Sequence, residues 1–262
     1  MKVMSVYIDG SDNDRDSLRL ATMFCRRVGG RLDVVYPQRP EIYVTPVSIA
    51  VPEDQDTIGE AKRAFDDVCA GVEGVSWVPV DAGLADAIRG YSFLHDVIIL
   101  ERVRGEEGPD VLALNTALFE TSAAVLVCPP DAPASVGRSV AVVWNGTAQS
   151  ARALHAATPL LESAEQVTVL VNGANAAAEP FRVLSYLEAR GIAASAEEFD
   201  GDVMTARGRG RAILEATHGE ADLLVMGAFG ENMLSSIMGL GRTTQKVCTA
   251  TKIPTLICNL SL

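Results

Sequence analysis

The chain carries the same segment twice. Residues 3–11 (VMSVYIDGS) and residues 139–147 (SVAVVWNGT) lie 136 positions apart, and each runs from an apolar stretch into Asp or Asn, Gly, and then Ser or Thr. Later in each half, apolar runs follow Asp96 and Asp222, and further apolar runs end at Cys128 and Cys258. Such a repeat predicts two tandem units of one fold.

The boundary between the repeats coincides with a proline cluster, residues 129–133 (PPDAP). Because proline lacks a backbone donor and stops helices and central strands, this cluster reads as a linker. We therefore expect one domain over 1–133 and a second over 137–262, and 262 residues are ample for two cores.

Each half alternates apolar strands with helical segments. In the second half we expect strands near 139–145, 167–172, 193–199, 222–227 and 254–259, and helices near 148–162, 179–190, 208–218 and 242–251. Strands such as residues 167–171 (VTVLV) show little alternation, as in parallel strands that are covered on both faces. The predicted fold class is α/β, with two doubly wound domains that each contain a five-stranded parallel sheet.

A glycine-bracketed stretch follows the fourth strand of the second half. It runs Met226-Gly227-Ala228-Phe229-Gly230, continues after a spacer as residues 240–244 (LGRTT), and enters a helix. Glycines let a ligand approach the backbone, and the N–H groups at a helix N-terminus favour an anion. The stretch predicts a phosphate or nucleotide site, whereas a loop that merely needs glycines to turn is the alternative.

Charge and composition exclude several classes of function. A formal net charge of −12 argues against general binding to nucleic acid or to an anionic membrane. Five widely spaced cysteines without a CxxC pair indicate neither disulfides nor zinc, and we expect a cytoplasmic protein with no metal site. His95, His155 and His218 are expected at the surface or in packing. No P-loop or serine-hydrolase motif is present, so no catalytic residues are assigned.

The repeat and the glycine motif together resemble the universal stress protein family in its tandem two-domain form. Nucleotide-binding members carry Gly, two residues, Gly, nine residues, Gly, and then Ser or Thr. Here Gly227 and Gly230 match, but ten residues precede Gly241, and Arg242 separates that glycine from Thr243. The resemblance implies the adenine nucleotide alpha hydrolase-like, or universal stress protein, fold and an adenine nucleotide that is bound without rapid turnover.

The resemblance also implies where a nucleotide binds in the second half. An acidic residue at the end of the first strand holds the nucleotide in the family, and backbone at the end of the second strand meets adenine. The resemblance assigns these two roles to Asn145 and Val171. With the glycine stretch and the start of the helix that follows it, the candidate site residues are Asn145, Val171, Met226, Gly227, Gly230, Gly241, Arg242, Thr243 and Thr244. Because Asn145 lacks the family's negative charge, a role in holding Mg²⁺ should be weaker here.

Side-chain roles can be added to this assignment. Arg242 could pair with phosphate, while Thr243 and Thr244 could cap the helix and donate to phosphate oxygens; alternatively they only cap, and Arg242 is solvated. We expect Gly227→Val to block the approach of a phosphate while leaving the fold intact.

The first half departs from the motif. It keeps Asp9, but a glutamate-rich stretch, residues 101–108 (ERVRGEEG), replaces the glycine turn and would repel phosphate. We expect a degenerate site there and one nucleotide per chain.

The predicted protein is therefore a cytoplasmic universal stress protein of regulatory function that binds ATP or AMP, with Mg²⁺ accompanying the nucleotide where it is needed. The chain is expected to form a homodimer. A nucleotide-free scaffold, a slow ATPase and a binder of another small anion or apolar ligand stay open as alternatives.

Overall fold

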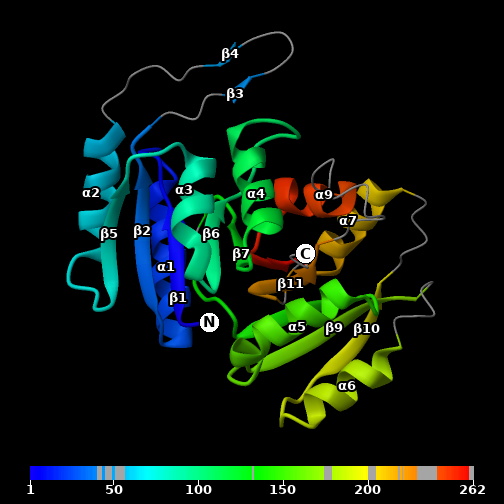
Figure 1. Ribbon diagram of the computed structural model, residues 1–262. Coiled ribbons are helices and arrows are strands. Elements are labelled where there is room, and N and C mark those ends of the chain that lie inside the picture. The colour runs from blue at the N-terminus through cyan, green and yellow to red at the C-terminus, as the bar shows by residue number, and fades with distance from the viewer. Residues whose placement is uncertain are drawn as a thin grey trace. The chain divides into compact units, whose positions relative to one another are not determined.

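The computed structural model (Figure 1) describes most of the chain. The described residues are 1–39, 43–44, 49–50, 57–131, 133–173, 179–199, 205–217, 219, 221–228 and 241–259. They form two compact units, Met1–Ala132 and Pro133–Leu260, which we call the first and second units.

The first unit alternates strands and helices around a parallel sheet. Its elements are β1 (Val3–Tyr7), α1 (Asp14–Val28), β2 (Arg31–Pro37), β3 (Tyr43–Val44), β4 (Ile49–Ala50), α2 (Thr57–Cys69), β5 (Val75–Val80), α3 (Leu84–Tyr91), η1 (Ser92–Leu94), β6 (Val97–Glu101), α4 (Pro109–Glu120) and β7 (Ala124–Cys128). The strand order is β7-β6-β1-β2-β5 with parallel pairs throughout, while β3 and β4 form a separate antiparallel pair.

The second unit repeats this order. Its elements are β8 (Ser139–Trp144), α5 (Ala148–Leu161), β9 (Gln166–Asn172), α6 (Pro180–Glu188), β10 (Ser195–Phe199), α7 (Ala206–Ala216), β11 (Leu223–Gly227), α9 (Arg242–Ala250) and β12 (Thr255–Cys258). The parallel strands are ordered β10-β9-β8-β11-β12, so the chain runs to one side of β8 and then to the other. The predicted α/β class, with a doubly wound five-stranded parallel sheet in each unit, is confirmed.

Burial explains why the strands lack alternation. Every residue of β7, β11 and β12 is buried, so both faces of each of these strands are covered. In the first unit α1 packs against α2, and α3 packs against α4. Phe24 and Leu18 of α1 are fully buried, whereas α1 stops at Gly29, whose left-handed backbone ends the helix.

One repeated aspartate joins the amino ends of neighbouring strands in both units. The Asp96 carboxylate, just before β6, accepts the amides of Lys2 and Val3 at 2.5 and 3.0 Å. The Asp222 carboxylate, just before β11, accepts the amides of Arg138 and Ser139 at 3.0 and 3.1 Å. The two aspartates therefore recur because each satisfies backbone donors at the start of its unit's first strand.

Candidate functional site

The first strand of each unit lies where the direction of chain winding reverses. In the second unit this switch point falls between β8 and β11, and in the first unit it falls between β1 and β6. Ligands of open α/β sheets bind outside the carboxyl ends of strands at such a point. The candidate sites therefore lie at the carboxyl ends of the strands that flank these two switch points, and we call these two places the edges of the two sheets.

The turn that leaves the first strand is built alike in both units. The side-chain oxygen of Asn145 accepts the Thr147 amide at 3.2 Å and the Thr147 hydroxyl at 2.6 Å. Asp9 accepts the Ser11 amide at 3.0 Å in the same way. The structure thus places Asn145 at the predicted edge, and its oxygen shapes the turn that begins α5.

Gly227 ends β11 against the first turn of α5. A Cβ atom at this position would lie 2.6 Å from the carbonyl carbon of Gln149 and 2.7 Å from the amide nitrogen of Ser150. The approach of α5 therefore favours glycine here, and we expect Gly227→Val to cost stability where the sequence predicted an undisturbed fold. Met226, the preceding residue, is fully buried in the core.

The amino end of α9 offers backbone rather than hydroxyl groups. Gly241 is its N-cap, no side chain caps it, and Arg242 is exposed. Thr243 and Thr244 are buried, and the Thr243 hydroxyl donates to the carbonyl of Ala206, the first residue of α7, at 2.9 Å. The expected capping by these threonines is wrong, because their face of α9 packs into the unit.

Close packing aligns α7 with α9. A Cβ on Gly210 would lie 2.8 Å from the Thr243 carbonyl oxygen and 2.9 Å from Cβ of Lys246. Together with the Thr243–Ala206 hydrogen bond, this contact places the amino ends of the two helices side by side. Their partial positive charges therefore add at one place.

The predicted adenine contact lies inside the sheet. Val171 is buried and is in register with Trp144 of β8 on one side and with Glu198 of β10 on the other. The residues that follow it, Asn172 and Gly173, are nearer the strand's exit. Of the other predicted residues, Gly230 and the spacer 231–240 lie outside the described residues.

Cys128 and Cys258 end the last strand of their units, and a group of opposite charge acts on the pKa of each thiol. Burial raises the pKa of the Cys258 thiol at the end of β12 to about 12, and the Arg152 cation on α5 opposes that rise. Burial also raises the pKa of Cys128 at the end of β7, and there the Glu101 carboxylate adds to the rise. The charged group that acts on the thiol is thus a cation in the second unit and a carboxylate in the first.

Sequence reasoning missed Arg152, although the repeat contains its signal. At the offset of 136 that aligns the two turns, Arg152 stands where the first unit has Asp16. At the end of the fourth strand, Gly227 likewise stands where the first unit has Glu101. Both differences make the second edge more favourable to an anion.

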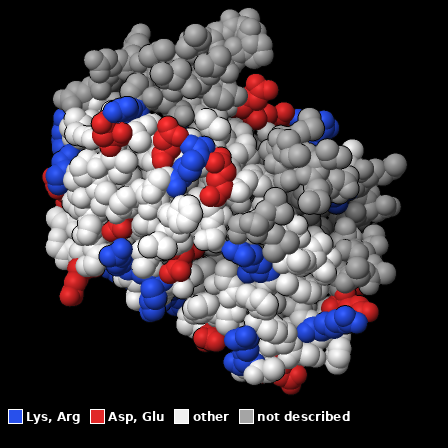
Figure 2. All heavy atoms as spheres, viewed as in Figure 1, with Lys and Arg blue, Asp and Glu red and all other residues white. Residues whose placement is uncertain are grey.

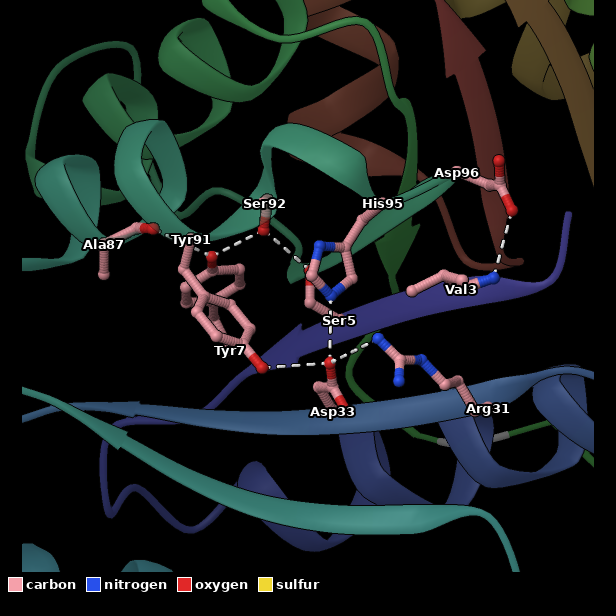
Figure 3. A network of polar contacts seen from close by, with 10 residues as sticks. All are labelled: Val3, Ser5, Tyr7, Arg31, Asp33, Ala87, Tyr91, Ser92, His95 and Asp96. Carbon is pink, nitrogen blue, oxygen red and sulfur yellow. Dashed lines mark hydrogen bonds and ion pairs between the residues drawn. The ribbon is translucent and has the colours of Figure 1, made fainter.

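A buried polar network lies elsewhere in the first unit (Figure 3). Asp33 of β2 accepts the Tyr91 hydroxyl at 3.0 Å and contacts Nε2 of His95 at 3.1 Å. Ser92 is hydrogen-bonded to the hydroxyls of Ser5 and Tyr7, which lie on β1, at 2.9 and 2.7 Å. Because Ser92 is engaged with these two hydroxyls, the group does not form a serine–histidine–aspartate relay. It is a structural network that fastens α3 and η1 to the sheet.

The visible surface carries charges of both signs, interspersed over the face that Figure 2 shows. Arg89, for example, contacts both Asp86 and Glu120. Within the described residues, no three or more His, Cys, Asp or Glu side chains are grouped to hold a metal ion. None of the described helices is long and apolar enough to cross a membrane.

Comparisons with solved structures give a consistent fold. A universal stress protein from Archaeoglobus fulgidus DSM 4304 matches with a TM-score of 0.69 and 17% identity, over 99% of this chain and 97% of that one. A putative universal stress protein from Pseudomonas aeruginosa matches with a TM-score of 0.58 and 14% identity, over 98% of this chain and 92% of that one. A functionally unknown protein from the same species matches with a TM-score of 0.57 and 14% identity, over the same shares of the two chains.

Neither the family models nor the curated proteins give a match to this sequence. The structural matches nevertheless span nearly the whole chain, both units included. The resemblance drawn from the sequence is thereby confirmed at the level of the fold: the chain has the fold of the universal stress proteins.

Proposed function

We propose that the second unit binds one adenine nucleotide at the switch point between β8 and β11, with its phosphates directed toward the amino end of α9. The proposal rests chiefly on the contrast between the two edges: Arg152 lies near Cys258, whereas Glu101 lies near Cys128. Two copies of one fold thus differ in charge at the place where such sheets hold ligands.

The groups around this edge suit a phosphate. The first turn of α9 has no side-chain cap, and Arg242 at its start is exposed. Backbone N–H groups at a helix N-terminus bind anions, and a guanidinium adds charge-assisted hydrogen bonds. Asn172 and Gly173 at the exit of β9 are the backbone positions for the adenine, in place of Val171. When Mg²⁺ accompanies the nucleotide, it would neutralise phosphate charge there.

The role that follows is regulatory. Nucleotide binding would shift the chain between conformations or partners, in a cytoplasmic protein that acts as a homodimer in stress responses. Slow ATP hydrolysis is the second activity to measure, by following ADP over time. Among the described residues at the switch point of the second unit, no pair supplies an evident acid and base, so binding without rapid turnover is the expected behaviour.

The two tryptophans allow a direct test, because Trp77 lies in the first unit and Trp144 in the second. In Trp77→Phe protein, the emission of Trp144, next to Asn145, should change and saturate on addition of ATP, ADP or AMP. Arg152→Gln should weaken binding about tenfold, the effect of losing roughly 1.4 kcal/mol of charge-assisted interaction.

Arg138 provides the matched control. It lies just before β8, at the opposite edge of the sheet, and pairs with Glu165 at 2.8 Å. Arg138→Gln should leave nucleotide affinity unchanged. An equal response to inorganic phosphate and ATP would assign a general anion site, and no response to any of these ligands would assign a nucleotide-free scaffold; either result contradicts the proposal.

A further inference from the structure

A carboxylate lies against the exit of β9 in the second unit. β9 is paired with β10 (Figure 1), and Glu198 of β10 is in register with Val171 of β9. Gly173 follows β9, two residues beyond Val171, and so continues the same face of the sheet. A Cβ atom on Gly173 would lie 3.0 Å from Oε2 of Glu198 and 3.6 Å from its Cδ. The carboxylate therefore lies beside backbone that no side chain covers at Gly173.

This carboxylate is available to a ligand. Glu198 is exposed, and within the described residues no donor or cation contacts its carboxylate. Other exposed glutamates of the second unit are paired, Glu165 with Arg138 at 2.8 Å and Glu215 with Arg211 at 2.7 Å. An ionised carboxylate only accepts hydrogen bonds, so Glu198 can engage an N–H or O–H group of a ligand.

The first unit does not repeat this arrangement. The strand registers place Gln38 and Pro79 of the first unit at the positions equivalent to Gly173 and Glu198. Proline has no side-chain acceptor, and Gln38 carries a side chain where the second unit has a bare backbone. The carboxylate beside an open backbone position is therefore a property of the second unit and not of the fold.

The strand order indicates which part of a nucleotide would meet Glu198. The strands run β10-β9-β8-β11, and neighbouring strands are about 4.8 Å apart, so the exits of β9 and β11 are separated by roughly 10 Å. A nucleotide with its phosphates beyond β11 extends its base across β8 to β9, beside Glu198 of β10. The negative charge of Glu198 also disfavours the reverse orientation, which would place the phosphates against a carboxylate.

We propose that Glu198 selects the base of the nucleotide, with its carboxylate accepting a hydrogen bond from the 6-amino group of adenine. This inference rests on the nucleotide site proposed above and adds the side chain that reads the base. Adenine presents an amino donor at the position where guanine presents a carbonyl acceptor. A carboxylate accepts from the first and repels the second, so Glu198 favours an aminopurine at this position.

Calorimetric titration of the intact chain with two ligands measures this contact. The ligands are ATP and the ATP analogue that carries hydrogen in place of the 6-amino group, so they differ in this one donor group. ATP should bind about tenfold more tightly, the effect of one hydrogen bond to a charged group that water partly replaces. In Glu198→Ala the ratio of the two affinities should fall to about one. The ratio cancels the general effect of one negative charge on the binding of an anion.

Glu197 gives the matched control. It is the preceding residue of β10, is also exposed, and lies on the opposite face of the strand. Glu197→Ala removes the same charge and should keep the ratio of affinities.

The outcomes separate this inference from the site on which it rests. ATP binding with a ratio that Glu198→Ala does not lower, or that Glu197→Ala lowers equally, would overturn the role of Glu198 and leave the nucleotide site standing. Absence of binding by both ligands would overturn the nucleotide site and the role of Glu198 together.

Discussion

Replacing Gly227 by alanine places a methyl group where the backbone of α5 already lies. The added carbon would stand 2.6 Å from the Gln149 carbonyl carbon, 2.7 Å from the Ser150 amide nitrogen and 2.8 Å from the Gln149 Cβ. Two of these three atoms are backbone, so a rotamer change does not relieve the contact. Overpacking of this kind costs about 1–3 kcal/mol. We expect the second unit to lose roughly that much stability.

Urea unfolding of Trp77→Phe protein, followed by Trp144 emission, measures the second unit alone. A loss of about 2 kcal/mol should lower the midpoint by roughly 1 M urea for a typical slope. Gly90→Ala is the control, and its unfolding is followed through Trp77 in Trp144→Phe protein. The added carbon at Gly90 has no neighbour within 4 Å, so the stability of the first unit should stay the same or rise slightly.

An unchanged midpoint for Gly227→Ala would refute this reasoning, because the α5 backbone would then tolerate a Cβ. If that stable variant also lost nucleotide binding, Gly227 would be a position where a phosphate approaches the backbone, as the motif alone suggests. A destabilised variant instead shows that loss of binding on substitution of Gly227 does not by itself locate the phosphate.

Three further changes test other parts of the account. Asp33→Ala should destabilise the first unit by about 2–5 kcal/mol in urea, since Tyr91 and His95 lose a buried acceptor; a cost near zero would show that the network does not hold α3 and η1. Thr243→Val should cost about 1 kcal/mol without changing nucleotide affinity, and a loss of affinity would restore the hydroxyl as a ligand. Folding raises the pKa of Asp14 to about 7, so the first unit should become less stable as pH rises from about 4 to about 7. The free energy of unfolding should fall by up to about 4 kcal/mol over this range. Urea midpoints that shift with pH alike in the parent and Asp14→Asn would contradict this.

The fold could be predicted because its signals are local. The strand expected over 222–227 is found at Leu223–Gly227, and the helix expected over 242–251 is found at Arg242–Ala250. Buried parallel strands are continuous apolar runs, and the repeat supplied each of them twice. The recurrence of Asp96 and Asp222 also has a local cause, because each binds amides next to its own strand.

The site was less predictable because it depends on tertiary packing. The motif identified Gly227 and Thr243. It did not show that α5 packs against Gly227 or that α7 packs over Thr243. Hydroxyl residues at a helix start usually indicate a cap, and here the packing of α7 on α9 overrides that preference. Arg152 belongs to no motif, and only alignment of the two halves reveals its charge difference from Asp16.

The central claim is that one of two similar units binds an adenine nucleotide and the other does not. Native mass spectrometry of the intact chain with ATP measures this directly, because it counts nucleotides per chain. The account predicts one nucleotide per chain, with reduced occupancy in Arg152→Gln. Two nucleotides per chain would show that the carboxyl groups of the first unit do not exclude phosphate, and none would contradict nucleotide binding by this fold.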